Sequence, residues 1–388
     1  MERSSRLVTR PFLLAILTML GVSLTMGMLF PVLPVYAKGP LDAGSVGVGI
    51  AVAASSPTAV LFQPIAGRLG DLRGRRILVI AGPLVAAASV AAYTLVDSLE
   101  GLVALRLVTG IGEGCTFVGA ATVVNDLATE ERRGEAVSLY SLGVWGGFAI
   151  GPVLGEAVLA HGSYDVVWLV AASCSLLATA LGLAIPETRP ALAAKPARRR
   201  LLHPAALGPG LVLVFSAVGF AGFNAFVALY ARNLGLDGAG WVFFAYSSLV
   251  VGIRIFGRRL PDRLGAKLAS GTALGLLAAG LLTIGLWNRP LGLFVGTAAF
   301  AAGTALSFPA LMTLAVERAD PAERSSVIGT FSACVDVGFA IGAVTLGGVA
   351  AAAGYDAVFI AGAVSALVGG LVLLRVTAVQ TVRVPEAA

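Results

Sequence analysis

Long apolar segments recur along the entire chain and are separated by short polar stretches. A bilayer core requires about 20 apolar residues for each spanning helix. Segments suited to this role lie at residues 12–36, 44–66, 77–97, 100–126, 135–160, 165–186, 207–231, 239–257, 268–287, 290–316, 326–352 and 355–375. The pattern therefore predicts an all-α membrane protein with twelve transmembrane helices.

Composition supports this interpretation and excludes a soluble fold. Hydrophobic residues make up 57% of the 388 residues and charged residues 12%, with a mean hydropathy of +0.91, whereas soluble domains are about 25% charged. The 49 glycines are typical of transmembrane helices that pack closely. The net charge of +6 comes from short basic clusters between apolar runs, a distribution that sets membrane topology and offers no surface for nucleic acid.

The basic residues predict the orientation of the chain in the membrane. If the N-terminus and every second loop are cytoplasmic, 22 of the 27 Lys and Arg residues lie on that side, in line with the positive-inside rule. We therefore expect a multi-pass protein of the inner (plasma) membrane with both termini in the cytoplasm. The longest polar stretch, residues 187–204, lies midway. It predicts an N-terminal six-helix bundle at 1–186, a cytoplasmic linker at 187–206 and a C-terminal six-helix bundle at 207–388.

An internal repeat relates the two halves of the sequence. The pentapeptide GFAIG occurs at 147–151 and again at 338–342, an offset of 191 residues. At the same offset Asp71 aligns with Asp262, and Tyr164 aligns with Tyr355. Six spans separate equivalent positions, and an even number of spans preserves direction across the membrane. The two bundles are therefore predicted to be parallel repeats.

The loop after the second span, GRLGDLRGRR at 67–76, places an acid among arginines. A tight basic turn accounts for its glycines and arginines but not for Asp71, which we expect at the N-terminus of another helix or paired with Arg132 or Arg133. The loop resembles the cytoplasmic signature between the second and third helices of the major facilitator superfamily. That resemblance implies a latch that stabilises one access state; a positive turn alone is the alternative. The matching residues here and in the second-half copy are Gly67, Asp71, Gly74, Arg75, Arg76, Asp262, Arg263 and Gly265.

The fourth span carries two charged residues. Arg106 followed by Gly110 resembles the family pattern of an arginine four residues before a glycine, and the resemblance ties Arg106 to proton coupling; alternatively, Arg106 snorkels outward. Glu113 lies at the midpoint of the span, where a charged acid costs about 2.5–3.5 kcal/mol on insertion scales. We therefore expect Glu113 to face the protein interior or a wet cavity and to load and release a proton. A neutral, hydrogen-bonded buried acid is the alternative.

The fifth span carries a stripe of glycines four residues apart and a proline. Its segment GFAIGPVLGE resembles the motif that marks proton-driven exporters of the superfamily, with Glu156 in place of the final glycine. Ordinary close packing of small residues is the alternative. The residues that carry the resemblance are Gly147, Gly151, Pro152 and Gly155.

Asp336 lies near the middle of the eleventh span, and its repeat equivalent in the fifth span is Trp145. An acid and an aromatic at equivalent positions suit a cavity for an amphipathic or cationic solute, and Asp336 is also a candidate proton carrier. An internal ion pair between Asp336 and Arg254 is the alternative. Further predicted cavity residues in the seventh span, for which simple packing is the alternative, are Phe220, Phe223 and Asn224.

On these motifs, nearly the whole chain resembles the drug/proton antiporter branch of the major facilitator superfamily. The resemblance implies two six-helix bundles, alternating access, and proton-coupled export of small amphipathic molecules, with no cofactor beyond a proton gradient. We expect a monomer whose partners are a small-molecule substrate and the lipid bilayer. An importer or facilitator of a nutrient or organic acid is the main alternative, and a non-transporting membrane sensor is a weaker one. No enzyme is expected, because His161 and His203 fall in loops on opposite sides of the membrane and no catalytic cluster or metal-binding spacing occurs.

Overall fold

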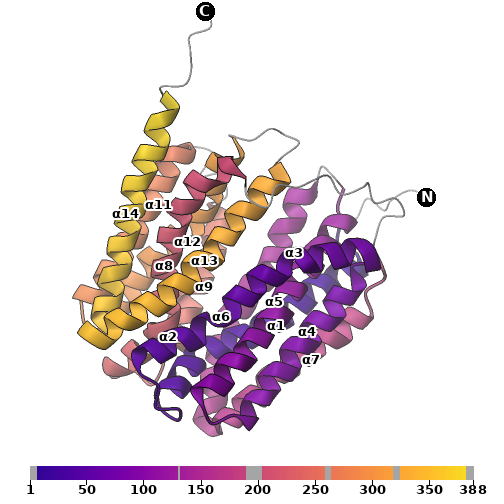
Figure 1. The fold of residues 1–388 in the computed structure, drawn as a ribbon, viewed down its shortest axis with the longest axis horizontal. Coiled ribbons are helices and arrows are strands. Elements are labelled where there is room, and N and C mark those ends of the chain that lie inside the picture. Colours follow the sequence, from indigo (N-terminus) through magenta and orange to yellow (C-terminus); the bar gives the residue numbers. More distant parts are fainter. Residues whose placement is uncertain (1–6, 130–131, 189–202, 258–263, 318–323, 382–388) are drawn as a thin grey trace, which may run out of the picture. The chain divides into compact units, whose positions relative to one another are not determined.

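The computed structural model describes residues 7–129, 132–188, 203–257, 264–317 and 324–381, and within these ranges the regular structure is entirely helical (Figure 1). Eleven helices in the described ranges are long and apolar enough to cross a membrane, and the apolar helix at Gly240–Phe256 is shorter. Each corresponds to one predicted apolar segment. In the first half, the largest difference between a predicted and an observed boundary is at the end of the second span, which stays helical to Arg73 instead of ending at 66. The prediction of an all-α protein with twelve apolar helices is confirmed for the described residues.

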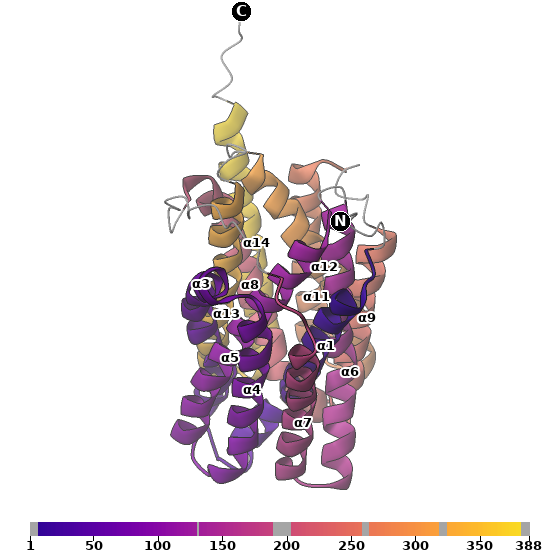
Figure 2. The ribbon, with the colours of Figure 1, turned by 90° about the vertical axis from the view of Figure 1, so that its right-hand side faces the viewer.

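The first compact unit consists of the described residues up to Ala43, those between Ala54 and Pro196, and Gly238–Ser247. In this unit α1 packs against α6 and α7, α4 packs against α5 and α7, and α3 packs against α5; Figure 2 shows α4, α5 and α7 running alongside one another. Its helices are α1 (Arg10–Lys38), α3 (Ser55–Arg73), α4 (Arg76–Ala91), the 3-10 helix η1 (Ala92–Leu95), α5 (Leu99–Leu127), α6 (Arg133–His161) and α7 (Tyr164–Leu183).

The second compact unit consists of Gly44–Ala53, the described residues from His203 to Asp237, and those from Ser248 onward. In it α8 packs against α13 and α14, α11 packs against α12 and α14, and α2 packs against α13. Its helices are α2 (Ser45–Ala53), α8 (Pro204–Asn233), α11 (Ala266–Leu286), α12 (Pro290–Val316), α13 (Arg324–Ala353) and α14 (Tyr355–Thr381). Helix α9 (Gly240–Phe256) starts in the first unit and ends in the second.

The predicted division of the sequence at 187–206 stays a prediction, because residues 189–202 lie outside the described ranges. The units do differ from the sequence halves in one respect. A ten-residue segment of the first half belongs to the second unit, and a ten-residue segment of the second half belongs to the first unit.

The repeated GFAIG segment makes the same kind of helix contact in each unit. A Cβ placed on Gly151 of α6 would lie 2.7 Å from the Cα of Gly27 in α1, and one placed on Gly342 of α13 would lie 2.6 Å from the Cα of Val218 in α8. Such distances leave no room for a side chain, so glycine is what allows these helix backbones to approach closely. The repeat seen in the sequence thus corresponds to α1 against α6 in one unit and α8 against α13 in the other.

Candidate functional site

Helix α5 holds a charged pair in which Arg106 is buried and Glu113 is partly buried. The side chain of Arg106 is 8% exposed and that of Glu113, the central residue of the helix, is 23% exposed. The Nη1 atom of Arg106 lies 3.7 Å from the Oε1 atom of Glu113, and its Nη2 atom donates a 2.9 Å hydrogen bond to Ser55 Oγ. Arg106 is therefore turned into the protein, and the alternative that it snorkels outward is wrong.

Glycines bring Ser55 to this pair. A Cβ at Gly110 would collide with the backbone carbonyl of Ser55 and with the Thr58 hydroxyl, and one at Gly114 would lie 2.9 Å from the carbonyl oxygen of Ala59. Thr58 Oγ1 also donates a 2.7 Å hydrogen bond to the carbonyl oxygen of Leu107, which ties α3 to α5. The family-like glycine after Arg106 is thus required by the close approach of α3.

A chain of hydroxyl groups continues from the pair between α5, α4 and η1. Thr109 Oγ1 lies 2.8 Å from Tyr93 Oη and 2.9 Å from Ser89 Oγ, and Tyr93 also interacts with Arg106. The ring of Tyr93 is fully buried edge-on against Trp168 of α7. Arg106 thus contacts Tyr93 as well as Ser55 and Glu113, and the pair belongs to a polar cluster in an otherwise apolar helix bundle.

The loop after α3 forms a second charged cluster. Asp71 pairs with Arg75, four residues later and just beyond the end of α3, and the Arg75 Nε lies 3.4 Å from Asp126 Oδ2 at the end of α5. Partial burial lowers the pKa of Arg75, but the hydrogen bond and charge of Asp71, followed by the charge of Asp126, outweigh it and raise this pKa above its ordinary value. Asp71 does not pair with Arg132, one of its two expected partners, and the side chain of the other, Arg133, lies outside the described residues. Because α3 remains helical to Arg73, Asp71 reaches Arg75 first, and Arg132 pairs with Glu135.

Glu187, just beyond α7, binds the start of α4. Its carboxylate oxygens accept hydrogen bonds from the backbone N–H groups of Arg75 at 2.7 Å and Arg76 at 3.2 Å. The Arg76 guanidinium in turn donates to the carbonyl oxygen of Leu183 at 2.8 Å. A Cβ at Gly74 would collide with the Glu187 carboxylate, and Gly74 has a φ of 104°. Glycine is required there for both reasons. Gly67 lies on α3 with open space beside it.

The second-half copy of this loop is described only in part. Asp262 and Arg263 lie outside the described residues. Gly265, the equivalent of Gly74, precedes α11 with a φ of 75°. The positive φ at both positions supports a similar backbone turn before α4 and before α11.

The glycine stripe of α6 faces α1. Cβ atoms at Gly147 and Gly155 would collide with or crowd the backbone of α1, and the Cδ atom of Pro152 lies near Gly27. Glu156, in place of the motif's last glycine, accepts hydrogen bonds from the backbone N–H groups of Ala239 and Gly240, both at 2.6 Å. These groups belong to the start of α9, where a carboxylate is favoured by the unsatisfied N–H groups and the helix dipole.

Three of the remaining predicted residues, Trp145, Phe220 and Phe223, contact other aromatic rings. The ring of Trp145 contacts those of Phe148 and Tyr246. In the second unit, Phe223 is fully buried against Phe300, and Phe220 contacts Phe339. Asn224 is 3% exposed and donates to the carbonyl oxygen of Phe220 at 2.9 Å, while Asp336 is partly buried on α13. Their predicted role as cavity lining stays a prediction.

Several residues of these clusters escape sequence reasoning. Ser55, Tyr93, Asp126 and Glu187 are separated in sequence from the residues that they contact. Asp126 and Glu187 carry one usable signal, because each is an acid at the end of an apolar span. Among the described residues, no group of three or more His, Cys, Asp or Glu side chains could hold a metal ion.

Nearly the whole chain matches one known protein family. The family described as Major Facilitator Superfamily matches residues 14–269 and 210–388 of the chain. The chain belongs to this superfamily. A relative in Salmonella typhimurium, named as the uncharacterized MFS-type transporter STM4428, is 29% identical over 365 residues, which cover 90% of this chain and 92% of the relative.

Solved structures of two transporters have the same fold. A structure of the nucleoside transporter NupG matches with a TM-score of 0.80 at 15% identity, covering 95% of this chain and all of that one. The human organic anion transporter MFSD10 matches with a TM-score of 0.69 at 22% identity, covering 94% of this chain and 99% of that one. The chain is thus a multi-pass membrane protein of the major facilitator type, and its relatives are named as transporters.

Proposed function

We propose that this superfamily member is a proton-coupled exporter of small amphipathic molecules that works by alternating access. One observation carries the proposal: an acid, Glu113, lies at the centre of a membrane helix beside Arg106. Acids at mid-depth in membrane helices are costly, and they mark proton and substrate pathways when they are present.

The geometry supports a specific coupling step. With Glu113 ionised, the 3.7 Å pair with Arg106 has no net charge. Proton uptake on Glu113 removes the attraction and leaves one positive charge, which Arg106 holds through its hydrogen bond to Ser55. Because uncompensated charge in a low-dielectric region is unfavourable, protonation favours a state in which Arg106 gains another partner or more water. A proton then drives a change between access states.

The export direction is supported by the exporter-like glycine and proline segment of α6. Asp336, partly buried on α13, is the second candidate proton carrier. Both acids lie within the superfamily fold. The fold itself does not set the direction of transport, which depends on whether substrate moves with the protons or against them.

The test begins with an efflux screen of amphipathic compounds in cells that lack their own exporters. The purified protein is then reconstituted in proteoliposomes, and transport of the best compound is followed with and without an imposed pH gradient. Glu113→Gln and Asp336→Asn are compared with Glu100→Gln, which makes the same kind of change at an exposed position at the start of α5. We expect gradient-driven transport to fall at least tenfold in one or both test variants, with control activity unchanged. Undiminished gradient-driven transport in both single variants and in the double variant would contradict the proposal.

The second candidate function is import or facilitated transport of a nutrient or organic acid. The fold match to a nucleoside transporter is consistent with it. Counterflow in the same proteoliposomes separates the two candidates. If substrate accumulates against its gradient on the side that the protons leave, it is exchanged for protons. That result supports proton-coupled export. Equilibration that is independent of the pH gradient supports a facilitator.

A further inference from the structure

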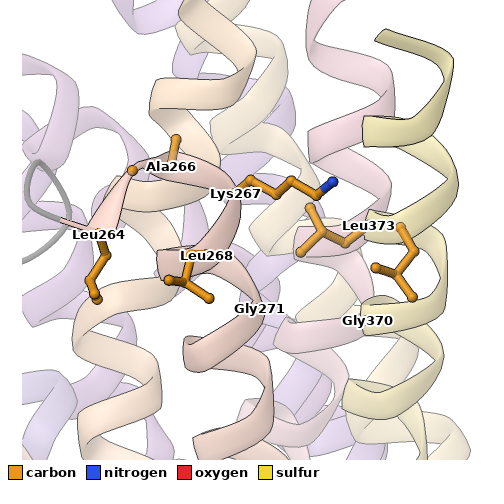
Figure 3. A pocket seen from close by; sticks show the side chains of 9 residues that line it. Leu264, Ala266, Lys267, Leu268, Gly271, Gly370 and Leu373 are labelled. Atoms are coloured by element: carbon orange, nitrogen blue, oxygen red, sulfur yellow. The ribbon is translucent and has the colours of Figure 1, made fainter. Parts of the chain in front are cut away.

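A groove on the second unit lies between the start of α11 and the end of α14. It has a volume of about 610 Å³ and is lined by nine residues, of which Lys267 is the one charged residue. Figure 3 shows Leu268 and Gly271 on α11 opposite Gly370 and Leu373 on α14, with the Lys267 side chain extending from α11 toward α14. The groove is therefore apolar along its length and basic at one end.

Two glycines leave this groove open. A Cβ at Gly271 or at Gly370 would meet no atom within 4 Å. The leucines beside them are exposed, Leu268 by 59% and Leu374 by 59%. A neighbouring helix covers Gly151, whereas Gly271 and Gly370, like Gly275 and Gly348, have open space beside them and pack against no helix within the described residues. In a membrane-spanning chain, such an apolar concavity is suited to an acyl chain.

The charge at the end of the groove selects the kind of lipid. Lys267 lies in the first turn of α11 and is exposed. None of the nine lining residues is acidic. The N-cap residue of α11, Gly265, provides no side-chain hydrogen bond to the first backbone N–H groups of that helix. Arg375, the residue after Leu374 on α14, is a second exposed cation. A phosphate group complements this charge distribution, as in basic pockets between transmembrane helices that bind anionic headgroups.

We propose that this groove binds one anionic phospholipid, with an acyl chain along Gly271 and Gly370 and the phosphate beside Lys267. The loop charges predict that the start of α11 and the end of α14 face the cytoplasm, so the lipid belongs to the cytoplasmic leaflet. The site is separate from the charged pair of α5, and the proposal does not depend on proton coupling or on the direction of transport.

The test uses the full-length protein, delipidated in detergent and then given phosphatidylglycerol or phosphatidylcholine at equal concentration. Native mass spectrometry counts the lipids that remain bound, and thermal unfolding measures stabilisation. We expect one phosphatidylglycerol to be retained at least fivefold more than phosphatidylcholine, with a higher Tm, because a ligand that binds the folded state stabilises it.

Two variants address the two ends of the groove. Lys267→Gln is expected to abolish the preference for phosphatidylglycerol, and Gly271→Leu to reduce retention of both lipids at least fivefold. Lys38→Gln and Gly348→Leu are the matched controls, since Lys38 is exposed at the other end of the membrane and Gly348 on α13 has open space beside it. Gly370→Leu repeats the second test from α14 if Gly271→Leu does not fold.

Three results would overturn the proposal. The first is equal retention of the two lipids by the unaltered protein. The second is unchanged retention in both groove variants. The third is a dimer that dissociates in Gly271→Leu without any change in bound lipid, which would assign the groove to a second copy of the chain.

Discussion

The Nη1 atom of Arg106 lies 3.7 Å from the Oε1 atom of Glu113, seven residues further along the same helix. Seven residues are about two helical turns, so both side chains lie on one face of α5. Ser55 of α3 binds Arg106 from the side. Since both side chains are largely buried, each depends on the other for compensation of its charge.

This pair predicts a non-additive effect on stability. Arg106→Gln leaves a buried carboxylate without its cation, and removal of one partner of a buried pair costs about 3–5 kcal/mol. The double variant Arg106→Gln/Glu113→Gln removes both charges, so we expect it to be more stable than Arg106→Gln alone. Thermal unfolding of Arg106→Gln, Glu113→Gln and the double variant in detergent measures this coupling. Additive losses would show that the two charges do not interact.

Gly110→Ala is expected to disrupt the polar cluster without altering any of its polar groups. The new Cβ would collide with the backbone of Ser55, and overpacking of this kind costs about 1–3 kcal/mol. We expect a lower Tm and loss of transport, because Ser55 moves away from Arg106. Gly275→Ala on α11, where a Cβ meets no atom within 4 Å, is the control. Equal Tm values for the two variants would refute the close contact.

The loop cluster predicts unequal roles for its two acids. The Asp71 side chain is 57% exposed and that of Asp126 is 17% exposed. We expect Asp71→Asn to cost less than about 1 kcal/mol, as for exposed pairs, and Asp126→Asn to cost about 1.5–3 kcal/mol, because Asp126 also accepts a hydrogen bond from Thr188. Unfolding in detergent, with exposed Asp97→Asn as the control, ranks the variants. A larger effect at Asp71 would contradict the prediction.

Glu156 is expected to protect the start of α9. In Glu156→Gln one carboxylate oxygen becomes an NH₂ group, which cannot accept the hydrogen bond from Ala239 or Gly240. Loss of such a cap costs about 0.5–2 kcal/mol. Hydrogen–deuterium exchange at residues 239–243 should accelerate in this variant, while exchange at the start of α4, which Glu187 caps, should not change. Unaltered exchange at both places would show that Glu156 does not cap α9.

Much of the fold follows from the sequence because the bilayer imposes simple requirements. A spanning helix must be long and apolar, and α12 begins and ends at the predicted residues 290 and 316. The helix register of α5 follows as well, since Arg106 and Glu113 are two turns apart on any helix. Their partner Ser55 does not follow, because its position depends on the separation of α3 and α5 at Gly110.

Glu156 illustrates another limit of sequence reasoning. In the sequence it is a departure from an exporter-like motif, which weakens the match. In the structure it is the group that binds the N-terminus of α9. The role of a residue that departs from a motif can be assigned only when the backbone that it contacts is known. For Glu156 that backbone lies 83 residues away.

The two ten-residue segments that belong to the unit of the other sequence half have a consequence for the order of assembly. The first compact unit includes Gly238–Ser247, whereas Gly44–Ala53 belongs to the second. A ribosome synthesises the first six spans and then α8 before it reaches residue 238. When the first six spans have entered the membrane, the first unit still lacks residues 238–247 and cannot complete its packing. Glu156 has no bond to the backbone of Ala239 and Gly240 until those residues are translated. Insertion of this protein is thus a process in which the early half remains unfinished until the eighth span arrives.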